Sequence, residues 1–116
     1  MAESARELIV VLTHGSDDEL SSVAFTIATG GIATGLRVAV FLTSAAVDLV
    51  RKQDTDSTVT PAFISDFLKR GGRVWACMPS VKARGYRQND LIAGVEIAGP
   101  SKIHELIRGG AATLSF

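Results

Sequence analysis

The chain has 116 residues, of which 47% are apolar, and its 12 basic and 12 acidic side chains cancel in charge. It lacks the basic excess that attracts nucleic acid or an anionic membrane, and its length predicts a single domain over residues 1–116. No apolar run approaches the roughly 18 residues of a membrane-spanning helix, and the polar start is unlike a secretory signal. A single cysteine excludes an internal disulfide and is typical of a reducing compartment, so we predict a cytoplasmic protein.

Five short apolar runs are predicted to be strands, because continuous Val- and Ile-rich segments are typical of parallel sheets covered on both faces. They lie at residues 8–12, 37–42, 74–77, 95–97 and 112–116. Helical patterns alternate with them. This alternation predicts an α/β fold, a three-layer α/β/α sandwich around a mostly parallel five-stranded sheet with right-handed crossovers.

The first predicted helix follows the first strand. Ser16 and Glu19 form a capping-box pattern at its start. Its apolar residues recur at helical spacing, which predicts that they share the buried face. These residues are Leu20, Val23, Ala24, Ile27, Ala28 and Gly31.

Three further helices are expected. One covers about residues 45–52, and a polar loop follows at 53–59. Thr60 and Pro61 are suited to open the next helix, as its N-cap and first residue. The last helix starts at Pro100. The side chains predicted to face inward are Phe63, Ile64, Phe67 and Leu68 in the second of these helices, and Ile103, Leu106 and Ile107 in the last.

Cys77 stands where an apolar strand gives way to a short helix. Pro79 has a fixed φ that suits the first helical position, and Gly85 suits a left-handed helix end. Backbone N–H groups and the positive end of a helix dipole converge at such a junction, which lowers a thiol pKa and favours the nucleophilic thiolate. The alternative is that Cys77 is a small buried hydrophobe at a strand end.

Polar loops follow three of the strands, at residues 13–16, 43–44 and 77–80. The functional crevice of an open parallel sheet lies at the carboxyl ends of its strands, so these loops favour a reactive Cys77. His14 is a candidate to hold the thiolate as an ion pair if its strand neighbours the Cys77 strand. A solvated turn histidine is the plainer interpretation.

Three of the residues that follow Cys77 are candidates to support its chemistry. Lys82 and Arg84 have the charge to stabilise a thiolate or persulfide, or to attract an anionic donor, although a solvated basic face explains them as well. Ser80 has a hydroxyl able to donate to the sulfur, and it also suits a plain helix start. His104 in the last helix is interpreted as a structural or surface residue.

Metal and cofactor sites are not expected. One cysteine and two scattered histidines have no ligand-like spacing for a metal. No G-x-G-x-x-G motif follows a strand and no Walker lysine is present, so the phosphate cradle of a dinucleotide or nucleoside triphosphate is missing.

The segment from Cys77 to Tyr86, with its Cys-Met-Pro-Ser and Lys-Ala-Arg-Gly-Tyr runs, resembles the cysteine segment of DsrE/DsrF-like sulfur-relay proteins. The likeness extends over nearly the whole chain, through residues 8–15, 38–43, 90–97 and 110–116. It implies a small α/β domain that forms trimers or hexamers and passes sulfane sulfur as a persulfide on Cys77. Ser80 is a departure, because many relatives have a second cysteine there.

The resemblance thus implies a cytoplasmic sulfur carrier, sulfurtransferase-like but without turnover of its own. Its partners would be sulfur donor and acceptor proteins or small persulfides. A non-catalytic oligomeric binding or scaffold protein with a structural cysteine is the alternative. Aromatic residues are typical of interface cores, which predicts a role in assembly for Trp75, Phe63, Phe67 and Phe116.

Overall fold

The computed structural model describes residues 6–16, 18–52 and 61–116. The predicted loop at 53–59 and the Thr60 cap lie outside these ranges. Five parallel strands form one sheet in the order β4-β3-β2-β1-β5. The strands are β1 (Glu7–Leu12), β2 (Arg37–Leu42), β3 (Arg73–Cys77), β4 (Val95–Ala98) and β5 (Ala112–Ser115). The five predicted strands are therefore confirmed, and each strand end lies within one residue of its predicted position.

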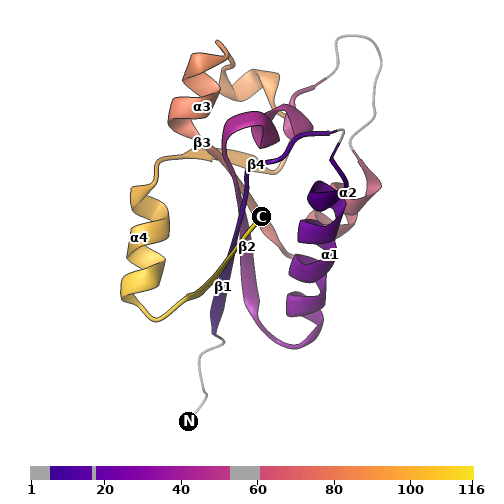
Figure 1. The fold of residues 1–116 in the computed structure, drawn as a ribbon, viewed down its shortest axis with the longest axis vertical. Helices are drawn as coiled ribbons and strands as arrows, with labels where there is room; N and C mark the ends of the chain where they lie inside the picture. Colours follow the sequence, from indigo (N-terminus) through magenta and orange to yellow (C-terminus); the bar gives the residue numbers. More distant parts are fainter. Residues whose placement is uncertain (1–5, 17, 53–60) are drawn as a thin grey trace.

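Helices cover both faces of the sheet, which confirms the α/β sandwich (Figure 1). On one side lie α1 and α2, and on the other side α4 lies alone. The helices are α1 (Glu19–Ala33), α2 (Ala62–Lys69), α3 (Met78–Ala83) and α4 (Ser101–Arg108), with 3₁₀ helices η1 (Ser44–Val50) and η2 (Gln88–Asp90). Among the described residues no helix is both long and apolar enough to cross a membrane.

The two faces of the sheet are buried to different depths. Under α1 and α2 the core is thick, and the ring of Phe25 stands edge-on to that of Phe67 at 5.5 Å between centroids. Both side chains are fully buried, and each such burial stabilises the fold by about 1.5–3 kcal/mol. Under α4, the buried cluster among the described residues holds four members: Ala39, Phe41, Trp75 and Cys77.

The predicted start of the first helix is wrong, and its predicted inward face is right only for Ala24, Ala28 and Gly31. Asp18 is the N-cap, and its carboxylate accepts from the N–H of Leu20 at 2.9 Å, so the Ser16 capping box does not form. Leu20, Val23 and Ile27 lie on the solvent side, between 36% and 39% exposed. The buried face is made of Ser21, Ala24, Phe25, Ala28 and Gly31.

Small residues explain why α1 presents that face to the sheet. A Cβ at Gly31 would lie 3.1 Å from Val38 and 3.3 Å from Leu8, so a side chain here would press on both neighbours, and glycine suits the close approach of the helix. The bulkier aliphatic side chains are left outside as an apolar stripe.

Smaller differences concern the other helices. The helix expected at 45–52 is the 3₁₀ helix η1, and Pro61 is an N-cap residue with α2 beginning after it. The inward stripe of α2 is confirmed, since Ile64 and Phe67 are buried. On α4, Ile103 and Leu106 pack inward as predicted, but Ile107 is 47% exposed.

Candidate functional site

Cys77 lies at the junction of β3 and α3, as the sequence predicts. It is the last residue of β3 and the N-cap residue of α3, and Gly85 beyond the helix has the expected left-handed φ of 73°. Its side chain is on the α4 side of the sheet together with Trp75, since residues two apart on a strand face the same way.

The thiol is covered. Cys77 is only 6% exposed, and Ala98, Ile103 and Leu106 pack against its cluster. No residue of the covering helix α4 is itself fully buried. The helix over Cys77 is therefore held by few apolar contacts, which is the property of a segment that opens at low free-energy cost.

Ser80 connects α3 to the loop after β2. Its hydroxyl oxygen accepts from the N–H of Ser44 at 2.8 Å and lies 3.3 Å from the hydroxyl of Thr43. Ser44 has a φ of 58°, a left-handed conformation that is unfavourable for a residue with a side chain. The Ser80 hydroxyl thus helps to hold a strained loop, and its contacts are with that loop.

Arg84 belongs to a charged network beside η1. Its Nε lies 3.3 Å from a carboxylate oxygen of Asp48, and the same carboxylate accepts a 2.5 Å hydrogen bond from the hydroxyl of Tyr86. This hydrogen bond, with a smaller contribution from burial, raises the pKa of Tyr86 above its usual value. Arg84 is therefore already paired, whereas Lys82 is exposed and has no ion pair among the described residues.

His14 does not meet the condition set for its role. Its strand β1 and the Cys77 strand β3 are separated by β2. The Nδ1 of His14 lies 2.7 Å from a carboxylate oxygen of Asp18, in a half-exposed pair. Beside this pair is an open crevice of about 360 Å³ lined by Gly15, Ser16, Asp18, Ala45 and Asp48. The carboxyl ends of β1 and β2 thus carry a separate polar cluster.

Neither histidine joins a metal site. In the ranges 6–16, 18–52 and 61–116, no three side chains of His, Cys, Asp or Glu gather as metal ligands do. His104 is exposed on α4, as expected.

The cover over Cys77 is what the sequence reasoning missed. Trp75 and Cys77 alternate with Val74 and Ala76, and this spacing alone indicates that the thiol shares a face with the indole. It does not indicate which helix lies over that face, because the order of the strands has to be known first.

The sequence matches the DsrE/DsrF-like family over residues 6–116. Two relatives come from Methanocaldococcus jannaschii. The uncharacterized protein MJ0760 is 29% identical over 100 residues, which make up 80% of this chain and 36% of that protein. The uncharacterized protein MJ0989 is 28% identical over 86% of this chain and 85% of its own length. The chain thus spans about a third of MJ0760 and most of MJ0989.

A solved structure shares the fold. It is a protein of unknown function, MTH1491 from Methanobacterium thermoautotrophicum, with a TM-score of 0.79 and 21% sequence identity. The superposition covers 97% of this chain and 100% of that chain, so the whole architecture is common to both.

Proposed function

The chain belongs to the DsrE/DsrF-like family, and on this premise we propose that it carries sulfane sulfur as a persulfide on Cys77. The observation that carries the proposal is the place of the only cysteine, at the carboxyl end of a parallel strand and the start of a helix. Such strand ends form the functional crevice of open α/β sheets. A reducing cytoplasm, where a lone thiol stays free, is the proposed setting.

The chemistry is an exchange between sulfur atoms. The thiolate of Cys77 attacks the terminal sulfur of a donor R–S–SH, the S–S bond of the donor breaks, and a new S–S bond forms on Cys77. The departing R–S⁻ takes up the proton that the Cys77 thiol lost on forming the thiolate, which gives R–SH. The reverse exchange with an acceptor thiol then releases the sulfur, so no external oxidant or reductant is needed.

Access to the thiol sets a condition on this cycle. Because only 6% of Cys77 is exposed and Ile103 and Leu106 of α4 pack on its cluster, we expect a donor to reach the sulfur when this helix moves away. Both are half-buried residues on a short helix, so local opening of this layer is the motion that the carrier requires.

The burial of Cys77 also favours a second function, that of an oligomeric scaffold with a structural thiol. A buried cysteine among apolar neighbours behaves as a small hydrophobe and is inert. Under this alternative, Cys77→Ala leaves every activity of the protein unchanged and affects only packing.

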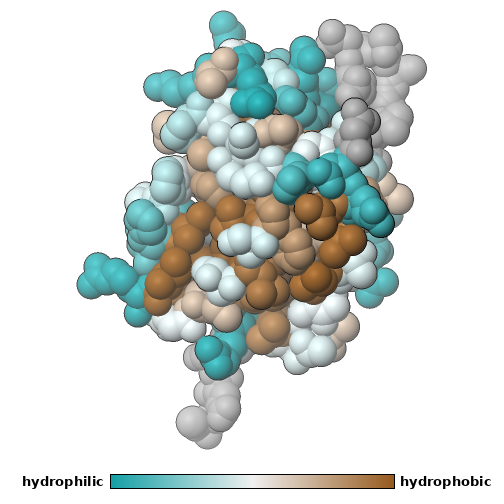
Figure 2. Space-filling view, viewed as in Figure 1, coloured by the Kyte–Doolittle hydropathy of each residue, from teal (hydrophilic) through white to brown (hydrophobic). Residues whose placement is uncertain are grey.

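Assembly into a homo-oligomer, preferably a trimer or hexamer, is part of the proposal. Figure 2 shows an apolar surface around the edge strand β5, between α4 and α1. Monomeric proteins rarely expose large contiguous apolar patches, so we assign this surface to further copies of the chain. Its exposed large side chains are Ile107, Leu114, Leu20, Val23 and Ile27.

Two of the four aromatic residues expected at this interface are buried within the single chain. Phe67 is fully buried and Trp75 is 4% exposed within the single chain. Phe63 and Phe116 also pack partly against the core. The apolar side chains left over for a partner are aliphatic.

Size exclusion with light scattering tests the assembly. A stable interface buries about 1,600 Å² and survives micromolar concentration, so the expected mass is three or six times 12.2 kDa. Val23→Glu together with Leu114→Glu should shift the mass toward one chain. A single-chain mass for the unmodified protein contradicts the assembly.

The intact mass of the protein tests persulfide loading. After incubation with a small persulfide and removal of the donor, the wild type should gain the mass of one sulfur atom, and Cys77→Ser should gain none. If the wild type gains no sulfur from either small or protein-bound donors, the scaffold function is favoured.

A further inference from the structure

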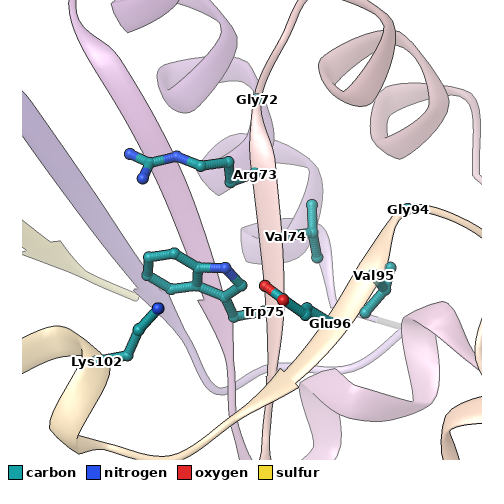
Figure 3. A pocket seen from close by; sticks show the side chains of 8 residues that line it. All are labelled: Gly72, Arg73, Val74, Trp75, Gly94, Val95, Glu96 and Lys102. Atoms are coloured by element: carbon teal, nitrogen blue, oxygen red, sulfur yellow. The ribbon is translucent and has the colours of Figure 1, made fainter.

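An open pocket of about 540 Å³ lies over β3 and β4. It is on the α4 side of the sheet, where this helix does not cover the strands. Figure 3 shows the side chains of Arg73 and Lys102 near the indole ring of Trp75, with the Glu96 carboxylate beside the ring. The volume is in the usual range for small-molecule sites, which have an apolar floor and a few polar groups. Here the indole of Trp75, a residue that is only 4% exposed, forms part of the floor.

The charges around the indole are unequally satisfied. The guanidinium of Arg73 lies 5.3 Å from the ring centre, and its Nη2 donates to Glu7 at 2.6 Å. Lys102 has its ammonium 5.9 Å from the ring centre. Within the described part of the chain neither Lys102 nor Glu96 has an ion-pair partner.

One free cation and one free carboxylate on either side of an indole suit a ligand with both charges. A zwitterion places its carboxylate at Lys102 and its ammonium at Glu96, and its apolar part lies against Trp75. A simple anion pairs only with the Lys102 ammonium, and the Glu96 carboxylate repels it.

The lining of the pocket reaches Trp75, two residues before Cys77 on β3, and does not include Cys77 itself. Trp75 and Cys77 face the same way on β3, about 7 Å apart along the strand. Lys102 also precedes Ile103, one of the two α4 residues that pack on the Cys77 cluster. A ligand held at Lys102 therefore contacts the helix that covers the thiol.

We propose that this pocket binds the sulfur donor itself, a small zwitterionic thiol compound of the amino-acid or short-peptide type in its persulfide form. The inference rests on the proposed persulfide function. The charged groups of the donor bind at Lys102 and Glu96. The terminal sulfur of the donor passes to Cys77 by the exchange described above, and the donor is left in its free thiol form.

The only tryptophan of the chain reports on the pocket directly. S-methylglutathione is the probe, because it carries an ammonium group and carboxylates but no reactive thiol. Titration should change the fluorescence of Trp75 to saturation, with equal affinity in the wild type and in Cys77→Ser. Lys102→Met keeps the aliphatic stem and removes the charge, so it should weaken binding about tenfold, as Glu96→Gln should.

Lys69→Met is the matched control, since this exposed lysine ends α2 on the opposite face of the sheet, and its affinity should equal that of the wild type. Absence of saturable binding to the wild type overturns the proposal, as does binding that both pocket variants leave unchanged.

Loading separates this proposal from the function on which it rests. If the probe fails to bind but Cys77 still takes up sulfur from a donor protein, only the pocket assignment is wrong. If the probe binds and Cys77 takes sulfur from no donor, the pocket is a ligand site and the carrier is wrong.

Discussion

The side-chain amide of Gln88 occupies the free edge of β4 by donating to the carbonyl oxygen of Val95 at 2.7 Å. Its own carbonyl accepts from the N–H of Ile97 at 3.3 Å, so one side chain satisfies two backbone groups of an edge strand. Unpaired groups on such an edge are a template for pairing with another chain.

Gln88→Ala should therefore lower the free energy of unfolding by about 1–3 kcal/mol, which is the worth of two hydrogen bonds. It should also increase aggregation on storage. Urea denaturation measures the first effect and light scattering the second. Asn89→Ala, at the exposed neighbouring position, is the control and should change neither. A Gln88 variant as stable as this control would show that the edge needs no cover.

Two adjacent glycines of α1 should respond differently to alanine. A Cβ at Gly30 meets no atom within 4 Å, so Gly30→Ala should stabilise the protein by about 1 kcal/mol through helix propensity alone. A Cβ at Gly31 meets Val38 and Leu8 at close range. Gly31→Ala should be less stable than Gly30→Ala by at least about 1 kcal/mol. Urea midpoints compare the two, and equal gains would mean that α1 is packed less closely than described.

Tyr86 should titrate above its ordinary pKa of 10.0, because its hydroxyl donates to the Asp48 carboxylate. The contact stabilises the neutral phenol of the folded state. Its contribution to stability is thus fully present below the unfolded pKa and is lost as pH rises through the folded pKa. Ultraviolet titration follows this residue alone, since the chain has one tyrosine.

Asp48→Asn should bring the midpoint of the Tyr86 titration down toward that of the denatured chain. An unchanged midpoint in Asp48→Asn would contradict the assigned cause.

Ser80 should act on stability and not on sulfur chemistry. Ser80→Ala leaves the N–H of Ser44 without its partner, which should cost about 1 kcal/mol in the free energy of unfolding. The rate of persulfide loading on Cys77, measured on the folded protein, should stay unchanged. Ser101→Ala, at an exposed position on α4, is the control for stability. Slower loading with unchanged stability would instead assign Ser80 to the thiol.

The strands could be predicted well because each is a continuous apolar run between polar turns. Residues 37–42 form β2 as predicted, and β3 ends at Cys77 as Pro79 requires. The junction that holds the thiol was therefore readable from the sequence.

The faces of α1 could not be predicted, because this helix is apolar nearly all round. Leu20 and Phe25 both belong to patterns at helical spacing, and hydrophobicity alone favours the wrong one. The close approach at Gly31 decides the matter, and it depends on the side chains of β1 and β2.

The surroundings of Cys77 also depend on strand order. His14 and Cys77 both follow strands, yet β2 lies between those strands. Chain order does not reveal that the last connection crosses over the sheet and lays α4 on the thiol.

A single-turnover transfer experiment distinguishes a sulfur carrier from a scaffold. Protein loaded with one sulfur on Cys77, and freed of donor, is mixed with an acceptor thiol while the intact masses of both are followed. The account predicts that the protein loses one sulfur atom as the acceptor gains it, and that Cys77→Ser treated in the same way transfers none. Loaded protein that keeps its sulfur, or a Cys77→Ser variant that transfers as much, would contradict a carrier built on Cys77.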